Sequence, residues 1–199
     1  MKIIVIGGTG TIGKAVVKEL SPRHEVVIVG REHGDAHVDI CSEESIKKMY
    51  QTIGKFDALI ATTGSVHFGP LAEMTADQYT IGLKSKLMGQ INLVLLGLKH
   101  INDHGSFTLT SGILNHDPIP LGSSASMVNG AVDGFVKSAA IEMPRHIRIN
   151  AISPTVLTES MPIYENYFPG FESVPASRVA LAYRKSVEGA QTGQIYTVW

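Results

Sequence analysis

The feature that most constrains the fold is a glycine-rich turn placed directly after a short apolar run at the start of the sequence. Residues 2–6 are mostly β-branched, and a segment of helical periodicity begins near residue 12. The turn between them consists of Gly7, Gly8, Thr9, Gly10, Thr11, Ile12 and Gly13. Gly8, Gly10 and Gly13 fit the spacing G-x-G-x-x-G, which permits a tight turn, close approach of a diphosphate and close packing of helix on strand. The sequence therefore predicts a dinucleotide site at the first turn of this helix.

The rest of the chain alternates short β-branched runs with longer helical segments. Runs typical of strands cover residues 2–6, 25–29, 58–61, 106–110, 147–152 and 194–198. Helical periodicity covers residues 12–20, 42–53, 75–101, 124–143 and 176–188, and Thr75 with Gln78 has capping-box spacing. The alternation predicts an α/β protein with a three-layer, doubly wound parallel sheet, and a single Rossmann-type domain over residues 1–199. Residues 160–175 are the least regular stretch, which we interpret as an ordered surface loop, with a lid over the site as the alternative.

Charge and composition exclude several classes of partner. The net charge is −1 and no block of Lys and Arg occurs, so the field needed to gather nucleic acid or anionic lipid is missing. Cys41 is the only cysteine, so no intrachain disulfide can form. No apolar run approaches the roughly 20 residues that cross a bilayer. We expect a cytoplasmic protein that has neither nucleic acid nor a membrane as its main partner.

The end of the second predicted strand indicates which dinucleotide binds. An acidic residue there would hold the ribose 2'-hydroxyl of NAD, but the sequence has Gly30 and Arg31. The glycine leaves room for a 2'-phosphate and the guanidinium pairs with it, which favours NADP(H) over NAD(H). A solvated surface arginine, partly neutralised by Glu32, is the alternative.

Further segments, in order along nearly the whole chain, resemble the short-chain dehydrogenase/reductase family. Residues 38–40 resemble the segment whose aspartate, here Asp39, contacts adenine, and residues 61–64 stand where the family has Asn-Asn-Ala-Gly. Residues 110–112 resemble the strand end that carries the catalytic serine, here Ser111, and residues 150–154 resemble the segment near the nicotinamide, with Thr158 placed to contact the carboxamide. The resemblance and the glycine turn together imply these cofactor-binding residues: Gly7, Gly8, Thr9, Gly10, Thr11, Ile12, Gly13, Gly30, Arg31, Asp39, Ile40, Ala61, Thr62, Thr63, Gly64, Pro154 and Thr158.

The catalytic residues of the family are mostly replaced. In the family, a tyrosine and a lysine four residues later transfer the proton. A gapless match of residues 122–127 puts Ser123 at the tyrosine position and Met127 at the lysine position, while Lys86 stands at the position of the family's helix asparagine. An aliphatic hydroxyl is a poor acid at neutral pH, and a thioether carries no proton. Only Ser111 of the four remains.

Two hypotheses fit this pattern. In the first, the chain is an oxidoreductase acting on a small carbonyl or alcohol, in which Ser111 polarises the carbonyl and Lys86 is the acid, with His67 or His116 as alternatives. A lysine in a desolvated cleft has a lowered pKa, which favours Lys86, although a solvated surface lysine is the competing interpretation. In the second, the protein binds NADP(H) without turnover, as a sensor or regulatory protein.

Two further features of the sequence concern metal binding and oligomeric state. His100 and His104 are four residues apart at a predicted helix end, but no third ligand follows at a fitting spacing, so we expect no metal. Gly130 and Gly134 lie one turn apart in a predicted helix and predict close packing against another backbone, of the sheet or of a second subunit. The family resemblance implies a homodimer through this helix and the preceding one, with Val94, Leu95 and Leu98 as apolar surface.

Overall fold

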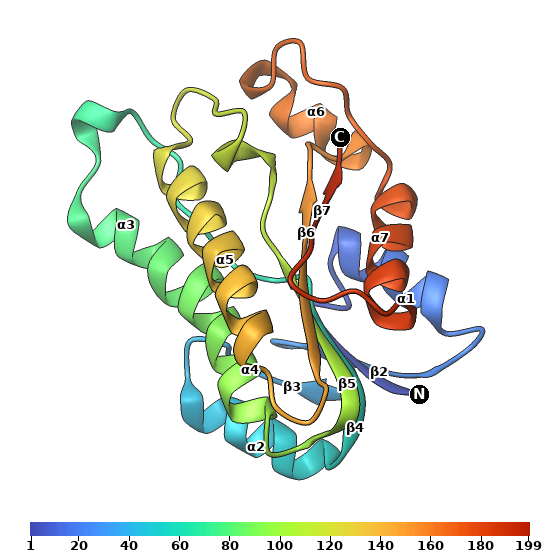
Figure 1. Ribbon diagram of the computed structural model, residues 1–199. Coiled ribbons are helices and arrows are strands. Elements are labelled where there is room, and N and C mark those ends of the chain that lie inside the picture. Colours follow the sequence, from blue (N-terminus) through green and yellow to red (C-terminus); the bar gives the residue numbers. More distant parts are fainter.

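The computed structural model describes residues 1–199 and contains one seven-stranded sheet (Figure 1). Its strands are β1 (Lys2–Ile6), β2 (Glu25–Gly30), β3 (Ala36–His37), β4 (Phe56–Ala61), β5 (Ile101–Thr110), β6 (Arg148–Pro154) and β7 (Ile195–Val198). All neighbours are parallel, in the order β3-β2-β1-β4-β5-β6-β7. The predicted doubly wound parallel sheet is confirmed. The strand order reverses between β1 and β4, and ligands of such sheets bind beyond the strand ends at this point.

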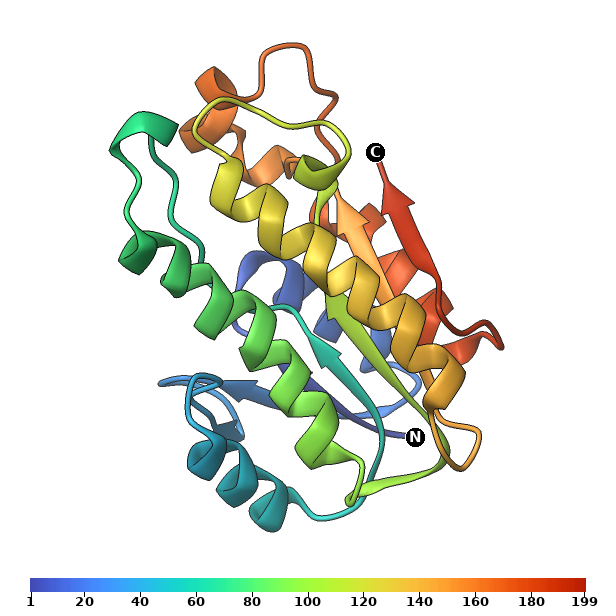
Figure 2. The same cartoon turned by 60° about the vertical axis from the view of Figure 1, so that its left-hand side comes forward.

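Helices cover both faces of the sheet (Figure 2). The longer ones are α1 (Thr11–Leu20), α2 (Glu43–Ile53), α3 (Ala76–Gly82), α4 (Gln90–Gly97), α5 (Ser123–Glu142) and α7 (Ala176–Glu188), with the π-helix η2 (Leu83–Gly89) between α3 and α4. The short ones are η1 (Leu71–Glu73), η3 (Ile113–Asn115), η4 (Thr158–Ser160), α6 (Met161–Tyr164) and η5 (Glu165–Tyr167). α1 and α7 pack on one face, and α2, α4 and α5 pack on the other. None of the helices combines the length and apolarity that a bilayer span requires.

Strand β1 is covered on both faces, which explains why residues 3–6 do not alternate between apolar and polar side chains. Ile4 and Ile6 belong to the core layer under α2, α4 and α5, whereas Ile3 and Val5 belong to the layer under α1 and α7. Successive side chains of a strand point to opposite faces, so a strand covered on both faces must be apolar at every position.

The predicted helix over residues 75–101 differs from the observed elements. The capping box of Thr75 and Gln78 is present and α3 begins where it predicts, but the helical run ends at Gly97. Ile101 then starts β5, pairs with Phe56 and is fully buried. Gly97, the last residue of α4, has low helix propensity, and the pairing of Ile101 with β4 then draws the chain into the sheet. β5 therefore begins five residues before the predicted strand start, residue 106.

The segment over residues 160–175 begins with the short helices α6 and η5, and residues 168–175 continue it as a loop. It is closed at its base by a bridge between Leu157 and Val174 and by the Glu159 carboxylate, which accepts a hydrogen bond of 3.0 Å from the backbone N–H of Ala176. This ordered surface segment agrees with the first of the two interpretations of the sequence. It stands above the carboxyl ends of β5 and β6 (Figure 1).

Candidate functional site

A cavity of about 320 Å³, here called the turn cavity, lies where β1, β2 and β4 end. It is lined by Ile6, Gly7, Thr9, Gly10, Gly30, Arg31, Val38, Asp39, Ile40, Cys41, Thr62, Thr63, Ser65 and Ser85. The lining comes from the glycine turn and from the loops after β2, β3 and β4. Nine of the predicted cofactor-binding residues are in this list. The other five are Ile6 and Val38, which adjoin predicted residues, and Cys41, Ser65 and Ser85, which no sequence motif marks.

The glycine turn has the geometry of an anion cradle. Gly10 caps α1 without a side-chain hydrogen bond, and the first turn carries no acidic residue, so its backbone N–H groups and positive dipole end are left for a ligand. A Cβ on Gly13 would lie 2.1 Å from the Gly7 carbonyl oxygen, because the helix packs directly on the turn. A Cβ on Gly10 would approach only that same oxygen, at 3.3 Å. The turn therefore fits a dinucleotide diphosphate, as the spacing predicts.

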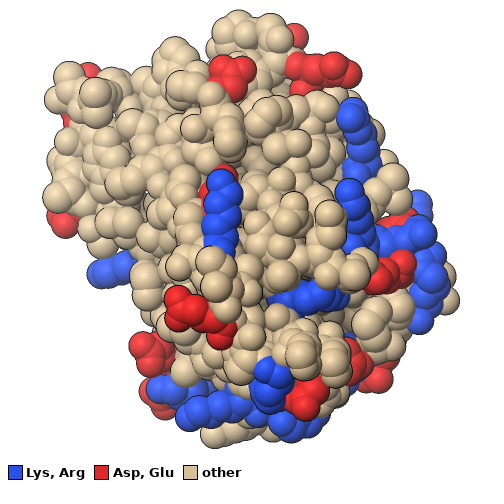
Figure 3. All heavy atoms as spheres, viewed as in Figure 1, with Lys and Arg blue, Asp and Glu red and all other residues tan.

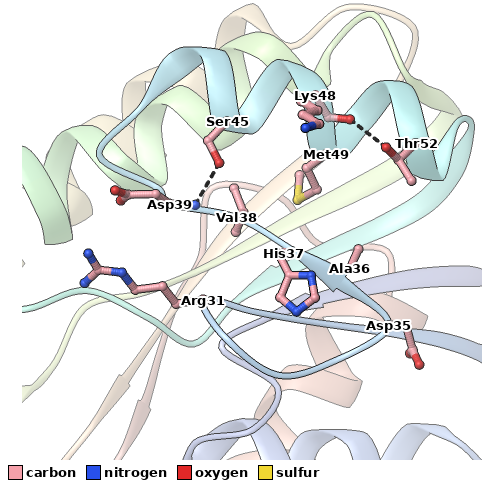
Figure 4. A pocket seen from close by; sticks show the side chains of 10 residues that line it. All are labelled: Arg31, Asp35, Ala36, His37, Val38, Asp39, Ser45, Lys48, Met49 and Thr52. Atoms are coloured by element: carbon pink, nitrogen blue, oxygen red, sulfur yellow. Dashed lines mark hydrogen bonds between the residues drawn. The ribbon is translucent and has the colours of Figure 1, made fainter.

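Arg31 stands at the mouth of the turn cavity and of a neighbouring space of about 550 Å³ between β3 and α2, here called the edge cavity (Figure 4). Its exposed side chain points to the same side as Asp39 and away from His37 (Figure 4). It takes part in none of the ion pairs, so Glu32 does not neutralise it. A free guanidinium at this place can pair with a phosphate.

The structure changes the explanation of Gly30. The sequence interpretation was that this glycine leaves room for a 2'-phosphate. A Cβ here would lie 2.2 Å from the backbone oxygen of His33, so the backbone of the following turn already occupies that space. Gly30 is therefore required by the turn, and the prediction of NADP(H) over NAD(H) rests on Arg31 alone.

A second cavity, of about 210 Å³ and here called the lysine cavity, continues beyond the ends of β5 and β6. Its lining includes Lys86 and Ser111, together with Ile12 and Pro154 from the predicted cofactor set. The Ser111 hydroxyl is buried and has no hydrogen-bond partner, while the Ser111 carbonyl accepts a hydrogen bond of 3.0 Å from the Lys86 ammonium. Buried polar atoms without a partner are rare, and in a cavity they indicate where a polar ligand atom binds.

Gln90 fixes the helical stretch that carries Lys86 against the sheet. Its amide donates to the Thr110 carbonyl (2.9 Å) and accepts from the Thr110 N–H (2.8 Å), so it ties the last residue of β5 to the start of α4. The same amide donates to the Lys86 carbonyl at 2.8 Å. Lys86 lies within the π-helix η2, and a Cβ on Gly64, whose φ is +129°, would lie 2.7 Å from the Lys86 Cα. π-Helical turns are frequent at functional sites.

The environment of Lys86 changes its acidity. Burial lowers the pKa of Lys86 from 10.5 to about 8, and the negative charge of Asp133 on α5 opposes this shift. Asp133 is buried, accepts a hydrogen bond of 2.7 Å from Asn115, and has one carboxylate oxygen without a partner. A lysine with this pKa exchanges protons near neutral pH, as general acid-base catalysis requires.

The structure corrects the register predicted for α5. Ser123 is absent from the lysine cavity, and its hydroxyl forms a 2.8 Å hydrogen bond with the Tyr79 hydroxyl; Met127 is also absent and is 41% exposed. The two positions four residues apart that do line the cavity are Ala125 and Asn129. Residues two apart on a helix point about 200° apart, so the gapless match of residues 122–127 places the wrong face of the helix in the site.

Asn129 and Thr155 are the polar lining residues that sequence reasoning missed. The Asn129 amide donates to the Gly112 carbonyl at 3.2 Å, and its own oxygen is buried without a partner. The Thr155 hydroxyl is likewise buried without a partner. With Ser111, three side chains of this one cavity therefore have an unpartnered polar atom. Asn129 lies four residues after Ala125, which also faces the cavity. With α5 in the correct register, this spacing identifies Asn129 as a lining residue.

The remaining predicted residues lie near the cavities without lining them. Gly8, Gly13 and Ala61 are buried or packed behind the turn, Thr11 is exposed at the first position of α1, and Gly64 packs on Lys86. The Thr158 hydroxyl bonds to the Ser173 hydroxyl at 3.2 Å and lines none of these cavities. Its contact with a carboxamide stays a prediction.

The histidines weighed as acids or metal ligands lie elsewhere. His67 and His116 do not line the lysine cavity, and His116 instead approaches Asp133 at 3.7 Å. His100 stacks on Tyr50 in the turn before β5, with 5.1 Å between ring centroids, so neither it nor His104 is on a helix end. No group of three or more His, Cys, Asp or Glu side chains is placed to hold a metal ion.

Comparison with known proteins adds independent information. The sequence model of a family described as enoyl-(acyl carrier protein) reductase matches residues 10–191. The crystal structure of the protein lin1944 from Listeria innocua is 56% identical, with a TM-score of 0.99 and full coverage of both chains. A small-chain dehydrogenase in complex with NADPH is 28% identical, with a TM-score of 0.88 over 100% of this chain and 96% of its own.

Two further relatives are similar to this chain over most of its length. The short-chain dehydrogenase/reductase GME11373 of Pestalotiopsis microspora is 27% identical over 88% of this chain and 77% of its own length. A tropinone reductase homolog of Arabidopsis thaliana is 28% identical over 79% of this chain and 70% of its own length. These matches agree with the family resemblance that the sequence motifs predicted.

Proposed function

Because the chain belongs to the short-chain dehydrogenase/reductase family, we propose that it is an NADP(H)-dependent oxidoreductase that interconverts a carbonyl and an alcohol, with Lys86 as its proton-transferring group. One observation carries the proposal: Lys86 is the only ionisable side chain that lines the lysine cavity, where the Ser111 hydroxyl has no partner. His67 and His116, the other candidates for the acid, do not reach this cavity.

Three observations support NADP(H) as the cofactor. The uncapped helix N-terminus after the glycine turn fits a diphosphate, and Arg31 offers an unpaired guanidinium at the end of β2. A relative that is 28% identical binds NADPH. The turn cavity would hold the adenosine diphosphate half, and the lysine cavity, to which Ile12 at the start of α1 contributes, would hold the nicotinamide half.

When bound, the reduced cofactor supplies the hydride for carbonyl reduction. The residues of this chain do the rest of the chemistry. The Ser111 hydroxyl donates a hydrogen bond to the carbonyl oxygen and stabilises the charge that develops there. The Lys86 ammonium donates a proton to the same oxygen, and in alcohol oxidation the neutral amine accepts that proton. The Asp133 charge favours the ammonium form of Lys86.

In the proposed arrangement, the lysine and the asparagine of the family have exchanged places between the two helical segments that carry them. The family's lysine comes from the helix that corresponds to α5 and its asparagine from the preceding helix. Here the cavity-facing residue of α5 is Asn129, and the cation comes from η2 as Lys86. Ala125 leaves no phenol at the tyrosine position, so Lys86 would act on the substrate directly.

A non-catalytic NADP(H) sensor is the second candidate, because a cavity without the phenol is also what a protein that binds without turnover would have. Titration with the four nicotinamide nucleotides, followed by the absorbance of reduced nicotinamide with a panel of carbonyl compounds, separates the two. We expect NADPH to bind and to be consumed. Tight NADPH binding without consumption would support the sensor, and the absence of any nucleotide complex would refute both.

Two variants assign the chemistry. We expect Lys86→Met to lower kcat by about 100-fold or more while the Kd for NADPH is retained, since general acid catalysis contributes about that factor. Lys84→Met is the matched control, because Lys84 is exposed on the same π-helix. Equal losses in both variants, or an unchanged kcat in Lys86→Met, would remove Lys86 from the mechanism.

We also propose that the protein is a homodimer. A Cβ on Gly134 would meet no atom within 4 Å, so packing on the sheet does not explain this glycine, and a second subunit is the remaining alternative. An apolar groove between α4 and α5, lined in part by Leu95, Leu98 and Phe135, lies in the region that the family resemblance implies. Sedimentation of the purified protein distinguishes a dimer from a monomer.

A further inference from the structure

We propose that the substrate is a neutral carbonyl compound with an aromatic ring, and that the ring binds between the segment over residues 160–175 and the loop after β4. The proposal rests on the proposed function and deepens it by naming the substrate class. Its basis is a separate apolar cavity of about 190 Å³, here called the ring cavity. All of the residues that line it are apolar or aromatic: Phe68, Ile119, Ile163, Tyr164, Tyr167 and Phe168.

The ring cavity continues the lysine cavity. Phe68 and Phe168 line both cavities, so the two cavities adjoin each other at these side chains. A carbonyl carbon held at Ser111 and Lys86 therefore has its substituent directed toward the ring cavity. The combined space suits a small molecule with one or two rings rather than an extended chain.

The walls of the ring cavity have surface that a ligand would cover. Ile163 is 72% exposed, and Tyr164 and Tyr167 are each 42% exposed. The two tyrosine rings meet edge to face with 6.4 Å between centroids, an arrangement into which a further ring can pack. Burial of these side chains against a ring removes apolar surface from water, which favours binding.

The charges around the ring cavity disfavour an anionic substrate. Residues 158–175 contain Glu159, Glu165 and Glu172 and neither Lys nor Arg, and acidic side chains appear at the top of Figure 3, over α6. No charged side chain lines the cavity itself. A carboxylate or phosphate on the substrate would lose water there without gaining a partner, which disfavours its binding. The ring substituent is therefore uncharged.

The specificity constant for four compounds tests the proposal. The compounds are acetophenone, acetone, cyclohexyl methyl ketone and the anion 4-acetylbenzoate, each with NADPH. We expect kcat/KM for acetophenone to exceed that for acetone by about 100-fold, since a buried six-carbon group is worth at least this factor. Cyclohexyl methyl ketone, which cannot pack edge to face with the tyrosine rings, should fall between the two. 4-Acetylbenzoate, whose carboxylate is on the ring, should be poorer than acetophenone by about 100-fold. Equal values for acetophenone and acetone, or preference for 4-acetylbenzoate, would overturn the proposal while the proposed function stands.

Variants of the ring cavity supply the second arm. Tyr167→Ala should lower the preference for acetophenone over acetone by about 10-fold, mainly through a lower kcat/KM for acetophenone. Ile141→Ala is the control, because Ile141 is 88% exposed near the far end of α5, away from this cavity. Loss of preference in both variants, or in neither, would contradict the assignment.

A direct binding measurement keeps the ring cavity testable if none of the ketones is reduced. Calorimetric titration with 1-phenylethanol in the presence of NADP⁺ should show saturable binding that Tyr167→Ala weakens and Ile141→Ala does not. Binding without turnover would support the ring cavity and count against the proposed function. No binding of 1-phenylethanol, or equal binding in all three proteins, would refute the ring cavity; this includes the case in which the exposed aromatic residues contact another protein.

Discussion

Replacing Lys86 by methionine should make the protein more stable while it destroys activity. Methionine has a similar length and no charge, so the change removes the buried ammonium with little change in volume. Lowering the pKa of Lys86 from 10.5 to about 8 corresponds to a cost of about 3 kcal/mol for holding the charged form in the folded state. The hydrogen bond to the Ser111 carbonyl is lost, at about 1 kcal/mol. The net gain at pH 7 is therefore about 2 kcal/mol.

The stability gained by Lys86→Met depends on pH, and the lowered pKa of Lys86 sets the direction of this dependence. Below pH 8 Lys86 is charged in both the folded and the unfolded state, so the wild-type protein bears the full cost. Between about pH 8 and 10.5 the folded state has released the proton and the unfolded state has not, so wild-type stability rises and the advantage of the variant shrinks. By pH 10 the two proteins should be nearly equal in the free energy of unfolding.

Urea unfolding at pH 7 and pH 10, together with thermal unfolding at pH 7, measures these differences for wild type, Lys86→Met and the exposed control Lys84→Met. At pH 7 we expect a midpoint of thermal unfolding raised by about 4–8 °C in Lys86→Met, since 1 kcal/mol shifts a domain of this size by about 2–4 °C. The control should stay within about 0.5 kcal/mol of wild type. A less stable Lys86→Met at pH 7, or a gain that is the same at both pH values, would refute the reasoning.

Four further substitutions test other parts of the account. Arg31→Ala should weaken NADPH by about 10-fold or more and NADH by less than about 2-fold in equilibrium titration, because the guanidinium pairs only with the 2'-phosphate; equal weakening would remove the reason for choosing NADP(H). Gly13→Ala should lower both stability and nucleotide affinity, since its Cβ would lie 2.1 Å from a backbone oxygen, whereas Gly134→Ala, with no atom within 4 Å, should stabilise the monomer by about 1 kcal/mol in denaturant melts. Asp133→Asn removes a charge that raises the pKa of Lys86, so the alkaline limb of carbonyl reduction should move to lower pH; a limb that stays or moves upward would contradict the coupling.

The fold and the cofactor end of the site follow from local sequence patterns. β-Branched runs, the capping box at Thr75 and the glycine spacing are each local signals, and each predicted element they mark is present. The start of β5 is different, because Ile101 enters the sheet only through its pairing with Phe56, which no local pattern shows.

The catalytic end of the site is less accessible from sequence. Matching residues 122–127 by similarity of small residues selects Ser123, but only the packing of α5 shows that Ala125 and Asn129 face the cavity. The same limit applies to Gly30, where the nearby carbonyl of His33, and not a ligand, requires the glycine. Lys86 was predictable because its position in the chain matches the family's asparagine, whereas the π-helix around it was not.

The pH dependence of the single-turnover rate in both directions tests the central claim most directly. If Lys86 transfers the proton, the rate of carbonyl reduction with NADPH falls as pH rises through about 8, because the ammonium is lost, and the rate of alcohol oxidation with NADP⁺ rises through the same pH. Both limbs should be absent in Lys86→Met. Rates that are flat between pH 6.5 and about 9.5, or limbs that persist in the variant, would show that another group moves the proton.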